Sequence, residues 1–279
     1  MPKLLAKVER PWALRLLPPF PAVANRVLSV VSSDNVGAGE IGAIIKIDPS
    51  FTAEVLRVAN SALFGFRREI ASVGHAVTVL GLNRVKSMAT YIALNAMVKP
   101  ALAMDTLRRV WIHSLVTALL MEELARASNS CLDIAYTAGM LHNLGSLGLM
   151  SAYPEEYSRM LEVSKECGFD RILAERDLFE IDHAAAGAYL AEEWDFPDTI
   201  IEAIATHHRA PGKGLGLSNL VRVACRLADV LDFAAFPHET SHTYEDLVAM
   251  VPRTRGSWFD DSGDGVKALI DQRLEGMPK

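Results

Sequence analysis

The spacing of the apolar residues is the feature that most restricts what this chain can fold into. Apolar residues recur at steps of three and four almost throughout, and strict alternation of apolar and polar residues is nearly absent. Half of the 279 residues are hydrophobic, which is enough to bury a sizeable core. The sequence therefore predicts an all-α protein built as a multi-helix bundle.

Capping residues, prolines and glycines mark the ends of several of these helices. Asp48 is placed as an N-cap before Pro49 at the first helical position, and Gly65 is the expected stop. Gly81 separates two further helices, and a linker is expected over 209–216. The other expected helices lie over about 21–32, 38–47, 70–80, 83–98, 103–127, 132–150, 154–167, 170–180, 183–194 and 197–208, with three more after the linker.

The charge is unevenly distributed along the chain. Residues 1–100 carry 12 Lys and Arg against 6 Asp and Glu, and the remainder carries 16 against 28, which together give the net charge of −6. The basic residues of the first part are scattered, with no run of five or more. We interpret them as a solvated surface, and nucleic-acid binding, which rests only on this charge, is not expected.

Apolar runs and cysteines indicate the compartment. No apolar run reaches the roughly 18 residues that a membrane span needs, and the first residues lack the apolar core of a signal peptide. We therefore expect a cytoplasmic protein without membrane association. Cys131, Cys167 and Cys225 form no CxxC pair, so we interpret them as reduced packing residues, neither disulfides nor a thiolate metal site.

Histidines are concentrated in the second half of the chain. Five of the eight lie on four predicted helices, and Asp229 lies on a fifth. Imidazole nitrogens and carboxylate oxygens suit Zn, Fe or Mn, and helical bundles can assemble a metal site from several helices. The five histidines are His113, His142, His183, His207 and His208.

Each of these residues also has an ordinary structural explanation. His183 follows Asp182 at a predicted helix start, where a cap accounts for the pair. The two histidines at 207–208 close a helix, where the dipole favours cations. Asp229 could pair with Arg226. Only the order and setting of the whole set favour a metal site.

That order resembles a known family. The stretches IDPSFTAEVLRVANSALFG, WIHS, AGMLHNLGSLGLM, IDHAAAG and IEAIATHHRAP occur in sequence. Residues from about Leu17 to His208 resemble an HDOD domain, a regulatory branch of the HD phosphohydrolase superfamily that is related to the HD-GYP proteins. The resemblance implies an N-terminal helical subdomain over 1–100, packed on an HD-like helical subdomain over 101–235. A helical extension over 236–279 would follow.

The resemblance also implies a set of metal ligands. The superfamily binds one or two metals through a first histidine, a His-Asp pair, later histidines and a distal aspartate. Carried over position by position, these fall on His113, His142, Asn143, His183, His207, His208 and Asp229. Six of the seven keep a ligand-type side chain.

The seventh position, Asn143, stands where the resemblance implies a bridging aspartate. A carboxylate offers two anionic oxygens to two metals. Asparagine offers one neutral oxygen and an NH₂ group, which is a hydrogen-bond donor and a poor ligand for a cation. Only Asp229 would remain to offset two dications. Ser146 replaces a lysine that assists the leaving group in active HD-GYP proteins, and the GYP signature is absent.

We therefore expect a single Fe, Zn or Mn ion, or none, in place of a working pair of metals. His183, His207 and His208 could hold one ion without a bridging carboxylate. The residues His113, His142 and Asp229 would form the poorer half. Two glycines, at 139 and 145, are interpreted as small residues that let neighbouring helices approach this pocket.

Two functions are compatible with these residues. The one we favour is a non-catalytic signal-transduction module with a degenerate metal pocket, binding a protein partner or a small signalling nucleotide. The alternative is a metal-dependent phosphohydrolase, a phosphodiesterase acting on a nucleotide or cyclic dinucleotide. The altered pair at 142–143 favours the first, and the six retained positions favour the second.

Overall fold

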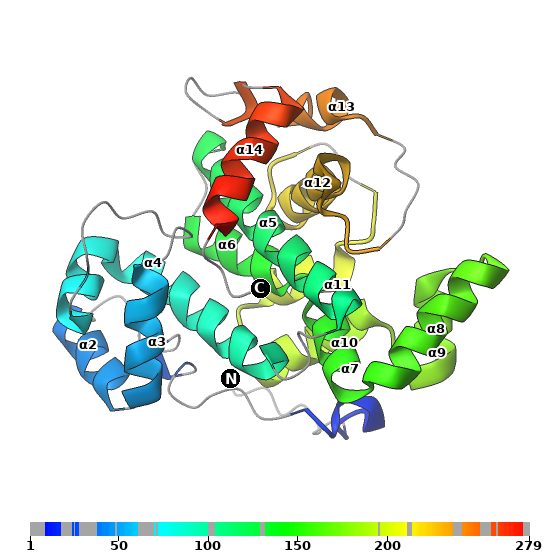
Figure 1. Cartoon of the computed structure of the whole chain (residues 1–279), viewed down its shortest axis with the longest axis horizontal. Helices are drawn as coiled ribbons and strands as arrows, with labels where there is room; N and C mark the ends of the chain where they lie inside the picture. The colour runs from blue at the N-terminus through cyan, green and yellow to red at the C-terminus, as the bar shows by residue number, and fades with distance from the viewer. Residues whose placement is uncertain are drawn as a thin grey trace, which may run out of the picture.

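All regular structure in the described part of the chain is helical, as the apolar spacing predicts (Figure 1). The computed structural model describes residues 9–17, 24, 26–27, 38–47, 49–60, 70, 72–99, 104–128, 132–194, 196–210, 214–236, 242–251, 258–260 and 262–275. No strand occurs among these residues. The prediction of an all-α fold is confirmed.

Three long α-helices are described in the N-terminal part. These are α2 (Ala38–Lys46), α3 (Pro49–Ala59) and α4 (Val73–Val98), and a 3₁₀ turn η1 (Trp12–Leu14) precedes them. The hydroxyl of Ser72 caps α4 by accepting the backbone N–H of His75. Inside α4, Gly81 has φ of 75°, a left-handed conformation that favours glycine, so the predicted separation there is a kink. The helix predicted over 21–32 falls almost wholly outside the described residues, as do the cap and stop predicted at 48 and 65.

The second half supplies the longest continuous bundle. Its helices are α5 (Asp105–Ala127), α6 (Leu132–Leu141), α7 (Leu144–Ala152), α8 (Pro154–Cys167), α9 (Arg171–Phe179), α10 (His183–Glu193), α11 (Asp198–Thr206) and α12 (Leu217–Ala228). A π-helical turn, η3 (Asp229–Phe233), follows α12 directly, and α13 (Tyr244–Val248), η4 (Trp258–Asp260) and α14 (Gly263–Leu274) come after it in this order. Most predicted ends agree within a few residues, because caps such as Asp182, which accepts the N–H of Ala185, act locally.

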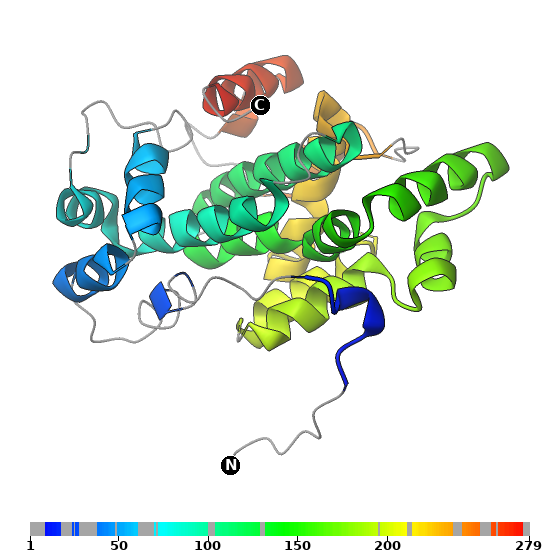
Figure 2. The ribbon, with the colours of Figure 1, turned by 60° about the horizontal axis from the view of Figure 1, so that its bottom comes forward.

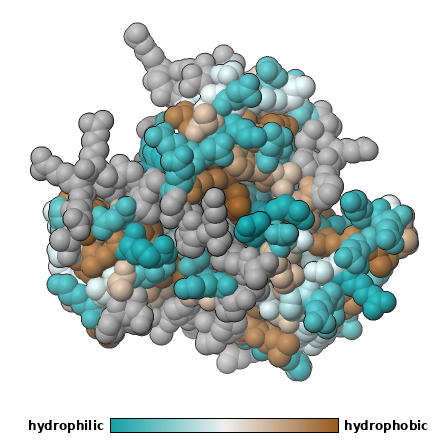
Figure 3. Space-filling model, in the orientation of Figure 1, coloured by the Kyte–Doolittle hydropathy of each residue, from teal (hydrophilic) through white to brown (hydrophobic). Residues whose placement is uncertain are grey.

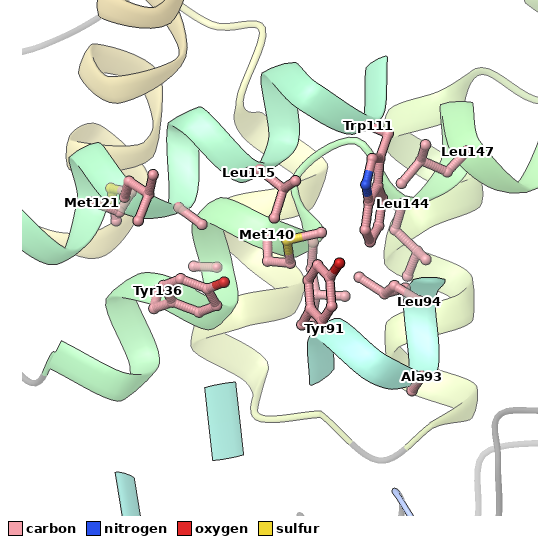
Figure 4. Packing of buried hydrophobic residues seen from close by; sticks show 14 of the residues in the cluster. Tyr91, Ala93, Leu94, Trp111, Leu115, Met121, Tyr136, Met140, Leu144 and Leu147 are labelled. Atoms are coloured by element: carbon pink, nitrogen blue, oxygen red, sulfur yellow. The ribbon is translucent and has the colours of Figure 1, made fainter. Parts of the chain in front are cut away.

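A shared apolar core joins the N-terminal helices to the rest of the protein. Figure 4 shows Tyr91 of α4 beside Trp111 of α5, and their ring centroids are 5.5 Å apart. Leu94, Met140 and Leu144 from three helices surround this pair, and all are fully buried. Burying each such side chain contributes about 1.5–3 kcal/mol. The N-terminal helices therefore pack on the second half, as the predicted fold requires.

Two views agree on the arrangement of the helices. Helices α2 and α3 lie at one end of the molecule and the α8–α9 hairpin at the opposite end, with α5, α6 and α7 between them (Figures 1 and 2). Hydrophilic and hydrophobic residues are mixed on the face seen in Figure 3. Among the described residues, no helix combines the length and apolarity that crossing a bilayer would require.

Candidate metal centre

The pair His142-Asn143 interrupts the helical stretch predicted over 132–150. The stretch forms two helices, α6 and α7, and Asn143 occupies the N-cap position of the second with φ of −99° and ψ of 18°. Neither proline nor glycine breaks the helix at this point. The local sequence therefore gave no ordinary stop signal, and the break places both side chains, 0% and 4% exposed, at a junction inside the protein.

Two glycines allow close helix contacts around this junction, as predicted. A Cβ on Gly145 would lie 1.9 Å from the backbone oxygen of His183 and 2.6 Å from the nitrogen of Gly187. A Cβ on Gly139 would lie 2.7 Å from the Cα of Ala118. Any side chain at Gly145 would push α10, which begins at His183, away from α7.

The five predicted histidines form one continuous cluster drawn from α5, the α6–α7 junction, α10 and the end of α11. Neighbouring ring centroids are 5.3 Å apart for His113–His142, 5.2 Å for His142–His207, 5.4 Å for His183–His207 and 4.0 Å for His207–His208. Residues separated by more than 90 positions therefore share one pocket.

The potential ligand atoms of the pocket divide into two groups. Within each group, the atoms all lie within 4.8 Å of one another. The first, which we call the three-histidine group, is His183, His207 and His208. The second, which we call the mixed group, is His113, His142 and Cys225. The first group has the members of one predicted half. In the second group, Cys225 stands in place of the predicted Asp229.

Hydrogen bonds orient four of the rings in the same way. Each uses Nδ1 to contact a backbone oxygen or a carboxylate: His113 with Phe233 O (2.9 Å), His142 with Gly139 O (2.6 Å), His183 with Glu175 Oε2 (2.5 Å) and His207 with Ile204 O (2.7 Å). An acceptor at Nδ1 requires the proton there, so Nε2 keeps its lone pair. Outer partners of this kind are typical of metal-binding histidines.

Burial keeps three of these rings neutral. It lowers the pKa of His142, His183 and His207 well below the ordinary value of 6.5, and the neighbouring pocket histidines lower it further. Burial and His183 likewise lower the pKa of His208. Neutral imidazole is the form that binds a metal.

The three Nε2 atoms deepest in the pocket have different partners. The Nε2 of His207 is buried and has no hydrogen-bond partner. That of His142 lies 2.9 Å from Nδ2 of Asn143, which donates to it. That of His183 lies 3.1 Å from a guanidinium nitrogen of Arg171 and also touches Nε2 of His208. An unpartnered buried acceptor is costly, so His207 favours a cation in the three-histidine group.

Asp229 lies on the side of the mixed group. Its Oδ1 is 3.6 Å from Nδ1 of His113, which is too long for a hydrogen bond, and Asp229 lines the same cavity as His113. Asp229 begins the π-turn after α12, and such turns are frequent at functional sites. The structure thus brings the last predicted residue to the pocket.

Cys225 belongs to this pocket, which corrects the interpretation of the cysteines as packing residues alone. Its Sγ lies 3.4 Å from Nε2 of His113. Burial raises the pKa of its thiol, so without a metal it stays protonated and can donate to that nitrogen. Cysteine spacing could not reveal it, because its partners come from other helices.

Glu175 and Arg171, one turn apart on α9, were also missed by the sequence analysis. Glu175 is fully buried and accepts from the backbone N–H of His183, from its ring and from the hydroxyl of Tyr157. Burial raises the pKa of the Glu175 carboxyl, and Arg171 opposes that rise. Their spacing is that of an ordinary surface ion pair, so it carried no distinguishing signal.

The two groups differ in how well they fit a metal. The three-histidine group offers three neutral imidazoles, two of them anchored at Nδ1, and one unpartnered Nε2 atom, which suits a single metal ion. In the mixed group, the amide of Asn143 already occupies the lone pair of His142. Among the described residues, neither group of potential ligand atoms includes a carboxylate. The residues present therefore fit one ion and not a bridged pair.

The metal pocket opens into a larger cavity of about 790 Å³. Residues of both groups line it, together with side chains from α8, α9 and η3. Its charged wall includes Arg109, Glu162, Lys165, Asp170, Arg171, Arg226 and Asp229. Cavities of this size accommodate a ligand as large as a nucleotide.

Comparison with known proteins gives one relative among the curated proteins. An uncharacterized protein of Treponema pallidum (strain Nichols) is 26% identical over 197 residues, which is 70% of this chain and 38% of the relative. The chain thus spans well under half the length of that relative.

Two solved structures share the fold. An HDOD domain protein of unknown function from Geobacter sulfurreducens superposes with a TM-score of 0.70 at 24% identity, covering 93% of this chain and 84% of the other. A protein from Shewanella amazonensis, whose name proposes a metal-dependent phosphohydrolase, gives a TM-score of 0.57 at 25% identity, covering 91% and 92%.

The family model of the HDOD domain matches residues 17–210. That range contains the whole three-histidine group and ends before Cys225 and Asp229. It also covers more than half of the 279 residues. The chain therefore belongs to the HDOD domain family.

Proposed function

We propose that this HDOD protein is a non-catalytic signal-transduction module whose pocket holds at most one metal ion. The observation that carries the proposal is the hydrogen bond from the amide of Asn143 to Nε2 of His142. A two-metal site needs a bridging anion at position 143. This chain has an amide there, and its N–H group occupies the lone pair with which His142 would bind a metal. Phosphodiester hydrolysis by two metals needs ions about 3.5–4 Å apart, and the mixed group does not favour the second.

The ligand that the module senses would occupy the cavity beside the metal pocket. Four cationic side chains and three acidic ones line that cavity, so an anionic ligand such as a small signalling nucleotide is favoured over a neutral one. A protein partner is the other candidate, and binding of either would report the state of the pocket without turnover.

The experiment combines metal analysis with an assay for turnover. The purified chain, saturated with Mn or Fe and then freed of excess metal, is assayed on phosphodiester substrates beside the Asn143→Asp variant. We expect no turnover and at most one ion per chain in the unaltered protein. Turnover that His142→Ala abolishes would overturn the proposal.

A phosphohydrolase remains the second candidate because one observation favours it. Four rings present Nε2 toward a common pocket with Nδ1 anchored, an arrangement that metal enzymes also use. One solved relative carries a name that proposes metal-dependent phosphohydrolase activity. The same assay decides between the two functions, since only the second predicts turnover in the unaltered chain.

A further inference from the structure

Arg171 places a positive charge inside the pocket that would receive the metal. It is the first residue of α9, after the capping Asp170, and its side chain is 18% exposed. One guanidinium nitrogen lies 3.1 Å from Nε2 of His183 and 3.5 Å from Nε2 of His208. The guanidinium thus covers two of the three atoms that would bind an ion in the three-histidine group.

Other contacts hold the guanidinium in this place. Its second nitrogen donates to Oγ of Ser146 at 3.3 Å and lies 3.6 Å from Oε1 of Glu175. Its central carbon is 4.0 Å from the ring centroid of Phe236, within the range of a cation–π interaction. Ser146 belongs to α7 and Phe236 to the segment after η3, so three parts of the fold define this position.

While it lasts, the contact with Arg171 excludes a metal at Nε2 of His183, an atom that also touches Nε2 of His208. Nδ1 of His183 is committed to Glu175 at 2.5 Å, so Nε2 is its only remaining ligand atom. One nitrogen lone pair accepts a hydrogen bond or binds a metal, but not both. A dication beside a guanidinium would also be repelled at short range in a buried site.

From this geometry we infer that Arg171 is a resident cation of the three-histidine group, which competes with the metal for His183 and His208. Binding of an ion requires the guanidinium to swing away from the two rings, and the adjoining cavity of about 790 Å³ gives it room. The inference rests on the same metal pocket as the proposed function but does not depend on the absence of turnover.

The test measures zinc affinity of the purified full chain, by competition with a chromophoric chelator. Arg171→Met removes the charge and the hydrogen bonds and puts an unbranched apolar side chain in their place. We expect zinc to bind at least about tenfold more tightly, because a hydrogen bond to a charged group is worth roughly one to two factors of ten. Arg171→Lys keeps the charge but loses the planar guanidinium, so its zinc affinity should lie between that of the unaltered chain and that of Arg171→Met.

The control is Arg57→Met, which removes one positive charge from α3, where Arg57 pairs with Glu54. Its zinc affinity should equal that of the unaltered chain. Unchanged or weaker binding in Arg171→Met would overturn the inference. That result would leave the proposed function standing, since the metal count and the turnover assay do not depend on Arg171.

A second variant covers the case in which Arg171→Met does not fold. Phe236→Leu leaves Arg171 in place but removes the ring that holds it, so zinc affinity should rise about two- to fivefold, the range of a cation–π contact. In the unaltered chain, the Nε–Hε signal of Arg171 in a ¹⁵N-labelled sample should move on zinc binding while that of Arg57 stays. A stationary Arg171 signal at full zinc occupancy would contradict the inference.

Discussion

Replacing Asn143 with aspartate exchanges a hydrogen-bond donor for a carboxylate beside a buried acceptor. The amide nitrogen of Asn143 lies 2.9 Å from Nε2 of His142, and the two residues are 4% and 0% exposed. Without metal, the variant loses one hydrogen bond, worth about 1 kcal/mol, and leaves a buried acceptor unsatisfied at about 1–3 kcal/mol. We therefore expect the metal-free Asn143→Asp variant to be less stable by about 2–4 kcal/mol.

Thermal unfolding of the metal-free proteins measures this loss. An unfolding entropy of about 2.1 cal/mol/K per residue, over 279 residues, converts each kcal/mol into roughly 1.7 °C. The Tm should therefore fall by roughly 3–7 °C. Added Mn or Fe should reverse the fall in this variant, because an ion at 100 times its Kd adds about 2.7 kcal/mol and satisfies the new carboxylate.

Two controls separate the contributions. Asn143→Ala loses the amide without gaining a charge, so its Tm should fall and metal should not restore it to the same degree. Combining His142→Ala with Asn143→Asp removes the opposed acceptor, so the two effects should not add. A metal-free Asn143→Asp protein as stable as the unaltered chain, with no additional metal bound, would refute the reasoning.

Three further predictions follow from the pocket. Gly145→Ala should lower the free energy of unfolding in urea by about 3 kcal/mol or more, because its Cβ would lie 1.9 Å from the backbone oxygen of His183. A Cβ on Gly74 would have no atom within 4 Å, so Gly74→Ala should cost no stability, and equal losses of stability in the two variants would contradict this explanation. Glu175→Gln should weaken zinc binding about 10- to 100-fold, since it removes the carboxylate partner of His183, and unchanged affinity would contradict the assigned orientation. Three buried pocket histidines have a pKa well below 6.5 when folded, so the unfolded chain takes up protons first. Their contribution to the free energy of unfolding is complete above about pH 6.5 and falls below that pH, by about 1.4 kcal/mol per pH unit for each histidine. A free energy of unfolding of the metal-free protein that stays constant from pH 7 to 5 would contradict this.

Local signals allowed much of the fold to be predicted. Caps such as Asp182 and the kink at Gly81 act within a few residues, and the apolar spacing identified the helices themselves. The break at 142–143 could not be predicted in this way, because no proline, glycine or capping hydrogen bond marks it. It follows from packing, where Gly145 must meet the start of α10.

The candidate site was predictable only in part, for a related reason. The histidines share a residue type, an order and a resemblance, so they could be grouped before their distances were known. Cys225 contacts His113 from a helix distant in sequence. Arg171 and Glu175 form an ordinary i,i+4 pair with each other and contact His183 from the preceding helix. Their roles depend on burial and on which ring nitrogen they meet, and neither property is visible in the sequence.

The number of metal ions bound per chain decides whether the pocket holds a single ion or a pair. The unaltered protein is saturated with Mn, Fe or Zn, freed of excess ion, and its metal and protein contents are measured together. The account predicts at most one ion per chain, held by the three-histidine group and lost in His207→Ala. Two tightly bound ions per chain would contradict it.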